Sequence, residues 1–279
     1  MIEIASGRLA KMHVEQGDLV SYRLDLGGES IALSKYLGKR LKLVHHEQIK
    51  CCHCQRVTKK SFSQGYCYPC FQKLARCDRC IMSPELCHYS AGTCREPEWG
   101  EQFCMQPHIV YLANSSGIKV GITRQTQVPT RWIDQGAIQA LPIVSVSSRL
   151  LSGLVEDHFR QWLPDRTNWR KMLKHDVEVM DLVAERDRLS ALAKDGLTTL
   201  REQYPNERID WLVEGKQWAF EYPSLKWPEK AKTYNLDKTP EIEDTLIAIK
   251  GQYLIFESAC LNIRKYTSYE VSLFAEAKL

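Results

Sequence analysis

The stretch CCHCQRVTKKSFSQGYCYPC, residues 51–70, decides the fold of this part of the chain. It holds two C-x2-C pairs, Cys51 with Cys54 and Cys67 with Cys70, and twelve residues separate the two pairs. Each pair places two thiolates on one tight turn, and two such pairs complete the four-sulfur tetrahedron that structural zinc prefers. The segment between the pairs is long enough for a hairpin, so the stretch predicts a zinc ribbon.

Cysteines continue beyond this ribbon. Ten of the eleven cysteines lie between Cys51 and Cys104, a clustering that is more typical of metal binding than of disulfides in a reducing compartment. A second zinc ion is therefore expected directly after the first. Its expected ligands are Cys77, Cys80, Cys87 and Cys94, with Cys104, His88 and His108 as alternates. Both ions are expected to be structural, because a site saturated with thiolates leaves no open position for a catalytic water.

The composition is that of an ordinary globular protein of two or three compact units, with 279 residues, 44% hydrophobic and 26% charged. No apolar run approaches the roughly 18 residues that a membrane-spanning helix needs. The first residues, MIEIASGRLAKMHV, lack the apolar core of a signal peptide. We therefore expect a cytoplasmic protein with no membrane partner.

Positive charge is concentrated around the predicted ribbon. The net charge is only +4, but residues 35–80 hold eleven Lys or Arg against two acids. Such a block is typical of a surface that binds phosphates, and it favours nucleic acid as the partner, with Lys59 and Lys60 as contacts. RNA is slightly favoured over DNA because no recognition helix is evident and both ends are rich in β-strands. The alternative interpretation is a solvated basic face. The oligomeric state stays open.

The pattern along the chain predicts an α+β fold. Residues 1–48 form a β-rich region, in which LVSYRLDL (19–26) places Tyr22, Leu24 and Leu26 on one face. Residues 49–107 form the two-zinc module, and residues 108–205 form an α/β domain with a three-stranded sheet and a long helix near residues 174–200. Residues 206–279 return to strands, and a faint likeness of GKRLKLV to KGQYLIF hints that both ends contribute to one β-structure.

Two strands with a turn between them open the α/β region, HIVYLA (108–113) and IKVGIT (118–123). Residues 109–168 resemble the GIY-YIG nuclease superfamily, the fold of homing endonucleases and of the bacterial excision-repair nuclease. Its first signature strand corresponds to Ile109-Val110-Tyr111 and its second to Lys119-Val120-Gly121. The family's helix arginine, glutamate and asparagine correspond to Arg131, Glu156 and Asn168. The whole chain is also similar to a bacterial zinc-ribbon-containing family, a likeness that implies no function.

The resemblance implies hydrolysis of a phosphodiester bond. Tyr111 would be the base or orient the water, and Arg131 would pair with the non-bridging phosphate oxygens. Glu156 would hold a Mg2+ or Mn2+ ion. Lys119 stands where the family's second tyrosine is expected and could bind phosphate as a point charge. Asn168 completes the candidate catalytic set.

Each of these residues also has a structural interpretation. A tyrosine in an apolar strand is often a core residue, and an arginine on a helix is often a solvated one. The cysteine pattern and the basic block predict a zinc-organised protein that binds nucleic acid, and the resemblance implies that it acts as a nuclease. A non-catalytic RNA-binding protein or a protein-interaction scaffold is the alternative.

Overall fold

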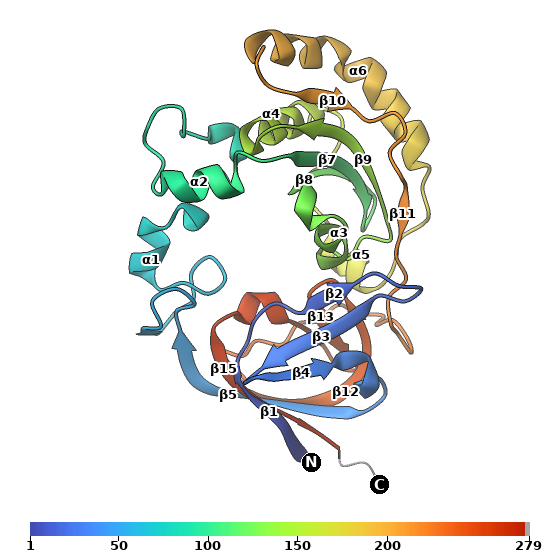
Figure 1. Cartoon of the computed structure of the whole chain (residues 1–279). Helices are drawn as coiled ribbons and strands as arrows, with labels where there is room; N and C mark the ends of the chain where they lie inside the picture. The colour runs from blue at the N-terminus through green and yellow to red at the C-terminus, as the bar shows by residue number, and fades with distance from the viewer. Residues whose placement is uncertain (277–279) are drawn as a thin grey trace.

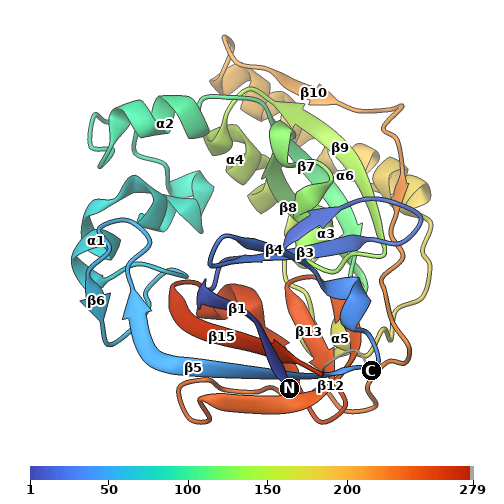
Figure 2. The same ribbon diagram turned by 60° about the horizontal axis from the view of Figure 1, so that its bottom comes forward.

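The computed structural model describes residues 1–276, which form three β-sheets with helices around them (Figures 1 and 2). The mixed α and β class expected from the sequence is confirmed. The seven-stranded sheet consists of β1 (Ile2–Arg8), β5 (Arg40–Lys50), β6 (Val57–Thr58), β12 (Glu241–Lys250), β13 (Tyr253–Phe256), β14 (Cys260–Asn262) and β15 (Tyr269–Ala275). The five-stranded sheet consists of β7 (His108–Asn114), β8 (Ile118–Arg124), β9 (Gln139–Val146), β10 (Ile209–Trp211) and β11 (Trp218–Ala219). The smallest sheet consists of β2 (His13–Glu15), β3 (Ser21–Leu26) and β4 (Glu29–Ala32).

The two ends of the chain share the seven-stranded sheet. Its strand order is β1-β15-β5-β12-β13-β14, with β6 beside β5. Strand β15 pairs with β1 on one side and with β5 on the other. The last strand of the chain therefore lies between two strands from the N-terminal region. The beginning of β1 and the end of β15 consequently lie side by side, with Ile2 opposite Ala275 (Figure 1).

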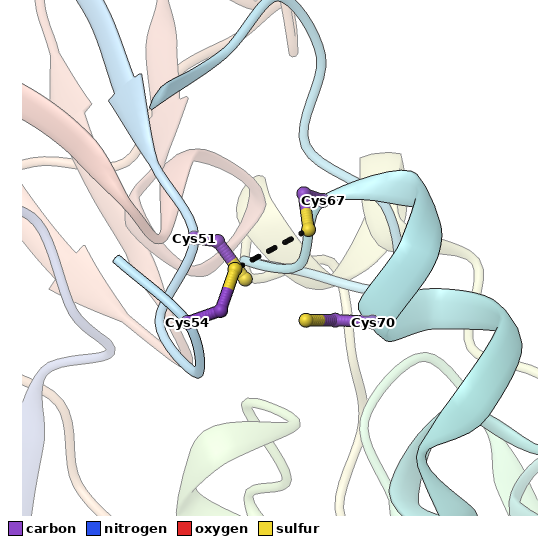
Figure 3. Close-up of side chains that lie close together, drawn as sticks. All are labelled: Cys51, Cys54, Cys67 and Cys70. Atoms are coloured by element: carbon purple, nitrogen blue, oxygen red, sulfur yellow. Dashed lines mark hydrogen bonds between the residues drawn. The ribbon is translucent and has the colours of Figure 1, made fainter. Parts of the chain in front are cut away.

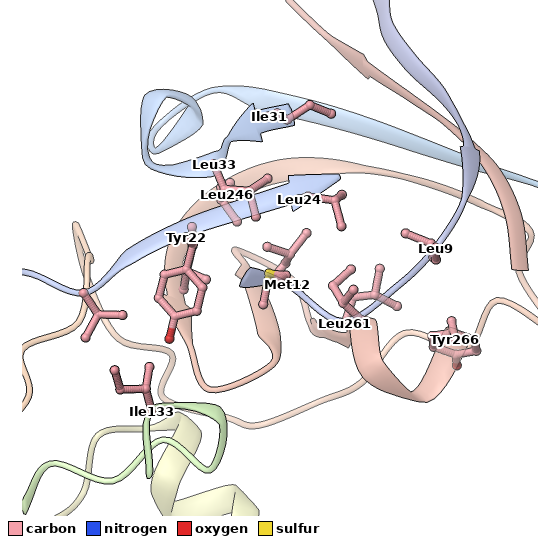
Figure 4. Close-up of a cluster of buried hydrophobic side chains, with 14 of the residues drawn as sticks. Leu9, Met12, Tyr22, Leu24, Ile31, Leu33, Ile133, Leu246, Leu261 and Tyr266 are labelled. Carbon is pink, nitrogen blue, oxygen red and sulfur yellow. The ribbon is translucent and has the colours of Figure 1, made fainter. Parts of the chain in front are cut away.

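A large apolar core lies beneath the small sheet (Figure 4). Strand β3 alternates between exposed and buried positions, and its buried face is Tyr22, Leu24 and Leu26, as the sequence predicts. Met12 and Leu246 come from opposite ends of the chain into the same cluster. Since hydrophobic burial drives folding, the two ends stabilise each other.

The five-stranded sheet has the order β10-β9-β7-β8, and every residue of its strand β7 is buried. Two of its strands are those expected from HIVYLA and IKVGIT, and β9 is the third strand of the expected sheet. The other two, β10 and β11, come from the segment assigned by sequence to the C-terminal β-rich region. Both pair with β9, so residues 209–219 belong to the central sheet.

The helices are α1 (Tyr68–Lys73), α2 (Pro97–Phe103), α3 (Thr130–Asp134), α4 (Arg149–Phe159), α5 (Trp169–Leu173) and α6 (Leu182–Gln203). Side chains of α4 and α6 bury one face of the five-stranded sheet in a second apolar cluster. The long helix begins at Leu182, later than expected, because the Asp181 carboxylate accepts hydrogen bonds from the N–H groups of Val183 and Ala184. Within the described residues, every helix is too short or too polar to cross a membrane.

Candidate metal centre and catalytic site

The four cysteines of the first predicted site lie together (Figure 3). Their sulfur atoms are all within 4.8 Å of one another, and those of Cys54 and Cys67 are 3.6 Å apart. Bonds of about 2.3 Å from zinc to sulfur give a tetrahedron whose edge is about 3.8 Å, so the separation fits. Cys51, Cys54, Cys67 and Cys70 are therefore placed to hold a metal ion, in an arrangement compatible with structural zinc.

Backbone hydrogen bonds favour the thiolate form of one member of this cluster, Cys51. Burial alone would raise the pKa of Cys51, but hydrogen bonds from the backbone at Cys54, Cys67 and His53 outweigh it and lower this pKa to about 6. A thiolate is the form that binds a metal. Cys52 lies outside the quartet, as expected for a residue inside the first C-x2-C pair.

The second group of cysteines is divided in the structure. Cys80, Cys87, Cys94 and Cys104 line one small cavity, together with Asp78 and His88. The cavity has a volume of about 20 Å³, which admits one water-sized occupant. Asp78, Cys80 and His88 place their ligand atoms within 4.8 Å of one another.

Cys77, expected as a ligand of the second ion, lies elsewhere. It is buried in the apolar cluster of the first site, with Leu74 and Tyr66. Burial raises the pKa of its thiol to about 11, and Cys52 and Ser63 are among the groups that act on it. The cavity is instead reached by Cys104, which follows α2, and His108 is not among the residues that line it. The short helical turn at residues 75–77 points Cys77 back toward the ribbon.

The tyrosine of the first signature strand is a fully buried residue. The Tyr111 ring packs against Trp132, with centroids 5.6 Å apart, and over the backbone of Gly121. A Cβ atom at position 121 would lie 2.7 Å from the Tyr111 hydroxyl oxygen, which explains why a glycine faces it. The Tyr111 hydroxyl donates a hydrogen bond to Gln135 Oε1 at 2.9 Å. Since no part of Tyr111 is exposed, it reaches a substrate only through its neighbours.

Lys119 shares that hydrogen-bond acceptor. Its Nζ atom donates to Gln135 Oε1 at 3.0 Å, and only 4% of the residue is exposed. Burial and, to a smaller extent, the Arg131 guanidinium lower the pKa of Lys119 to about 8, while Glu156 and Asp165 oppose this shift. The ammonium group therefore loses its proton at a lower pH than that of an exposed lysine.

Glu156 lies on α4, half-buried and near the same lysine. Burial raises its pKa to about 7, with a further contribution from Asp165, and the cations Arg160, Lys119 and Arg149 partly compensate. Within residues 1–276 the Glu156 carboxylate forms no ion pair closer than 4.0 Å. A buried carboxylate without a fixed partner can exchange a proton or accept a cation.

Arg131 on α3 is half-buried, and its charge acts on Tyr111 and Lys119. Burial raises the pKa of Tyr111 and the Arg131 charge opposes this rise, whereas at Lys119 the same charge adds to the lowering caused by burial. Burial is the main cause that lowers the pKa of Arg264, and the charge of Arg131 is a second cause. Arg264 in turn donates to Gln64 Oε1 at 2.6 Å, so it joins this site to the hairpin of the zinc ribbon.

The charges of Arg131 on α3 and Glu156 on α4 thus act on both Tyr111 of β7 and Lys119 of β8. Asn168 is different: its side-chain oxygen accepts hydrogen bonds from the backbone N–H groups of Arg170 and Lys171 and caps helix α5. Lys59 and Lys60 are exposed in the ribbon hairpin, where the Lys60 amine lies over the ring of Phe62.

An open cleft of about 410 Å³ adjoins Lys119 and Gln135. Its walls are Asp134, Asp165, Arg166, Thr167, Trp169, Met172 and Tyr253. Two of these site residues, Gln135 and Asp165, are ones that the sequence analysis missed. Gln135 follows α3 and gives no motif signal, and Asp165 lies in an irregular segment that only the fold places near Glu156.

Comparison with known families adds one result to this geometry. Residues 38–271 match the model of a family described as protein of unknown function (DUF2797), so the chain belongs to that family. The match spans the ribbon, the five-stranded sheet and most of the seven-stranded sheet. No curated protein and no solved structure matches the chain.

Proposed function

We propose that this protein binds nucleic acid and hydrolyses a phosphodiester bond of structured RNA or DNA, with a GIY-YIG-like site in residues 108–205. The observation that supports the proposal is that Lys119 lines an open cleft and that the charges of Arg131 and Glu156 act on it, although 36 residues separate Lys119 from Glu156. Cations beside a carboxylate with a raised pKa are the groups that phosphoryl chemistry requires.

Each side chain has a distinct role in the proposed reaction. Arg131 binds the non-bridging phosphate oxygens and stabilises the charge that develops on them. Lys119 donates to the same phosphate when charged, or accepts a proton from the attacking water when neutral, since its pKa is about 8. Tyr111 is a positioning residue that acts through Gln135, which holds the Lys119 amine.

A divalent cation fits the donors around Glu156. Mg2+ and Mn2+ prefer carboxylate oxygens and keep several waters, and Glu156 has Asp165 as its neighbouring carboxylate. Such an ion, bound mainly by Glu156, would supply Lewis-acid stabilisation of the phosphate charge. Glu156 then contributes its ionised form, which ion binding favours.

The nucleic acid would extend from this site to the ribbon. Arg264 lies near Arg131 and binds the hairpin residue Gln64, and Lys59 and Lys60 occupy the same hairpin. A zinc ion at the four-cysteine cluster would fix the hairpin against this surface. Eleven cysteines free of disulfides fit a reducing location, and we infer that the protein is cytoplasmic.

The test is incubation of purified protein with Mg2+ or Mn2+ and end-labelled structured RNA and duplex DNA. Cleavage is expected for the wild type and is expected to fall at least about 100-fold in Glu156→Gln and Arg131→Ala, because each removes a charged group of the site. Arg188→Ala is the matched control, since Arg188 is exposed on α6 and pairs with Glu185 away from this site. Cleavage that persists in both site variants would refute the assignment.

Binding without cleavage is the second candidate, and the burial of Lys119 and Tyr111 favours it, because buried groups reach a phosphate poorly. Here affinity should fall with rising salt and be weakened in Lys59→Ala/Lys60→Ala. If the protein is a protein-interaction scaffold instead, it should purify free of nucleic acid, with a low ratio of absorbance at 260 nm to that at 280 nm.

A further inference from the structure

The cavity beyond the ribbon carries the strongest signal outside the proposed catalytic site. Four cysteines within residues 80–104, at positions 80, 87, 94 and 104, line a space for one water-sized occupant. A cavity of this size lined by four thiols is chemically unusual, because free cysteines normally fill space as small apolar groups. A metal ion is the occupant that such a donor set recognises.

We propose that Cys80, Cys87, Cys94 and Cys104 bind a second structural Zn2+ ion, and that this ion holds the loop that supports helix α4. Four thiolates and one Zn2+ give a net charge of 2 − 4 = −2. The positive charges of Arg149 and Arg124 act on the Cys104 thiol and would offset this charge. Cys77 is not a ligand, since it is buried in the cluster of the first site.

Asp78 and His88 are the competing ligands, and their contacts argue against them. The Asp78 carboxylate is paired with Arg95 at 2.7 Å and accepts the Arg79 N–H at 2.6 Å. His88 is held at both ring nitrogens, by Thr93 Oγ1 at 2.8 Å and by Asp78 at 3.4 Å. Both side chains therefore already have hydrogen-bond or ion-pair partners, whereas within residues 1–276 the four thiols of the cavity have no such partner. Such groups typically orient the ligands of a metal from behind.

Two backbone carbonyl oxygens, those of Cys104 and Ile81, join the proposed metal site to the start of α4. Arg149, the first residue of α4, donates its backbone N–H to the Cys104 oxygen at 2.8 Å and its guanidinium to the Ile81 oxygen at 2.6 Å. Gly153 on the next turn packs against Pro84 and Glu85, and a Cβ atom there would lie 2.5 Å from the Glu85 nitrogen. The proposed ligands thus bracket Ile81, Pro84 and Glu85, which contact the start of α4, and Glu156 lies two turns further along the same helix.

Metal analysis of the full-length protein tests the ligand set. The wild type should contain two zinc ions per chain, Cys104→Ser should contain one, and Cys77→Ser should still contain two. The matched variant His88→Ala should also keep two. A wild type with one zinc, or a Cys77→Ser protein that loses an ion while Cys104→Ser keeps both, would overturn the proposal.

X-ray absorption at the zinc edge of the wild type keeps the test valid if Cys104→Ser fails to fold. Only sulfur neighbours are expected, at about 2.3 Å, and a nitrogen or oxygen shell at about 2.0–2.1 Å would show a mixed site and refute the four-thiolate set. Support for α4 has its own readout in hydrogen exchange. In Cys94→Ser, exchange should rise in residues 149–153 and stay unchanged in β5 and β15, and no change in α4 would refute the support.

Discussion

The Nζ atom of Lys119 lies 3.0 Å from Oε1 of Gln135, and the same oxygen accepts the hydrogen bond of the buried Tyr111 hydroxyl. One amide therefore satisfies two polar groups that have almost no contact with water. It also fixes the amine at the edge of the cleft. Gln135 lies in neither β7 nor β8, yet it links the Tyr111 side chain of β7 to the Lys119 side chain of β8.

Replacing this amide tests its role. Gln135→Leu leaves the Tyr111 hydroxyl and the Lys119 amine without their shared acceptor, so the free energy of unfolding should fall by about 1–3 kcal/mol. Denaturant titration measures the loss. Gln125→Leu is the control, because residue 125 is exposed, and it should change stability by less than about 0.5 kcal/mol. Equal effects of the two changes would contradict the shared-acceptor role.

A second prediction concerns Gly121, whose missing side chain leaves room for the Tyr111 ring. Gly121→Ala places a methyl group 2.7 Å from the ring and should cost about 1–3 kcal/mol of stability. In a Tyr111→Leu background the clash is absent, so the cost of the alanine should shrink. A double-mutant cycle measures this coupling. Additive effects would show that the ring does not depend on the glycine.

The raised pKa of Glu156 predicts a pH-dependent stability. Its pKa is about 7 in the folded protein against a normal value of 4.5, so between these values the folded state binds more protons than the unfolded one. Stability from this group is therefore present at low pH and lost as pH rises toward 7. Glu156→Gln should gain stability relative to wild type over this window, by up to about 3 kcal/mol. Denaturant melts at pH 5 and 8 without added divalent cation measure the gain, and an equal difference at both pH values would contradict it.

Lys250 predicts the opposite trend at higher pH. This lysine is fully buried, with Nζ 2.9 Å from His175 Nδ1, and burial lowers its pKa to about 7 from 10.5. The unfolded state therefore binds more protons between these values, and stability from this group is lost as pH falls toward 7. Lys250→Met should raise stability relative to wild type at pH 7 more than at pH 10, by on the order of 3 kcal/mol. Thermal melts of both proteins at the two pH values decide this, and a constant difference would contradict it.

Removal of one ligand from the first metal centre should release its ion. Cys54→Ser is expected to lower the metal content by about one ion per chain and to increase hydrogen exchange in residues 51–74, because metal binding contributes to folding there. Cys52→Ser is the matched control, since Cys52 lies outside the quartet and should keep the metal. Loss of the ion from the control alone would disprove the ligand assignment.

The sequence determined those features that depend on nearby residues. Two C-x2-C pairs place four thiols around one point because each pair closes a local turn, and Cys51, Cys54, Cys67 and Cys70 are found together as predicted. The alternation in β3 and the two strands around Gly117 follow from the same local rules. The GIY-YIG-like site is a resemblance carried by short motifs, and it stays a prediction.

Only the tertiary structure decided the features that depend on contacts between distant segments. The pairing of β15 with β1 and β5 joins the two ends of the chain, and no local pattern encodes that choice of partner. The same reason separates Cys77 from the cavity and brings Cys104 into it, although the C-x2-C spacing favoured Cys77. Gln135 and Asp165 likewise acquire their neighbours from packing between elements, which spacing along one chain cannot supply.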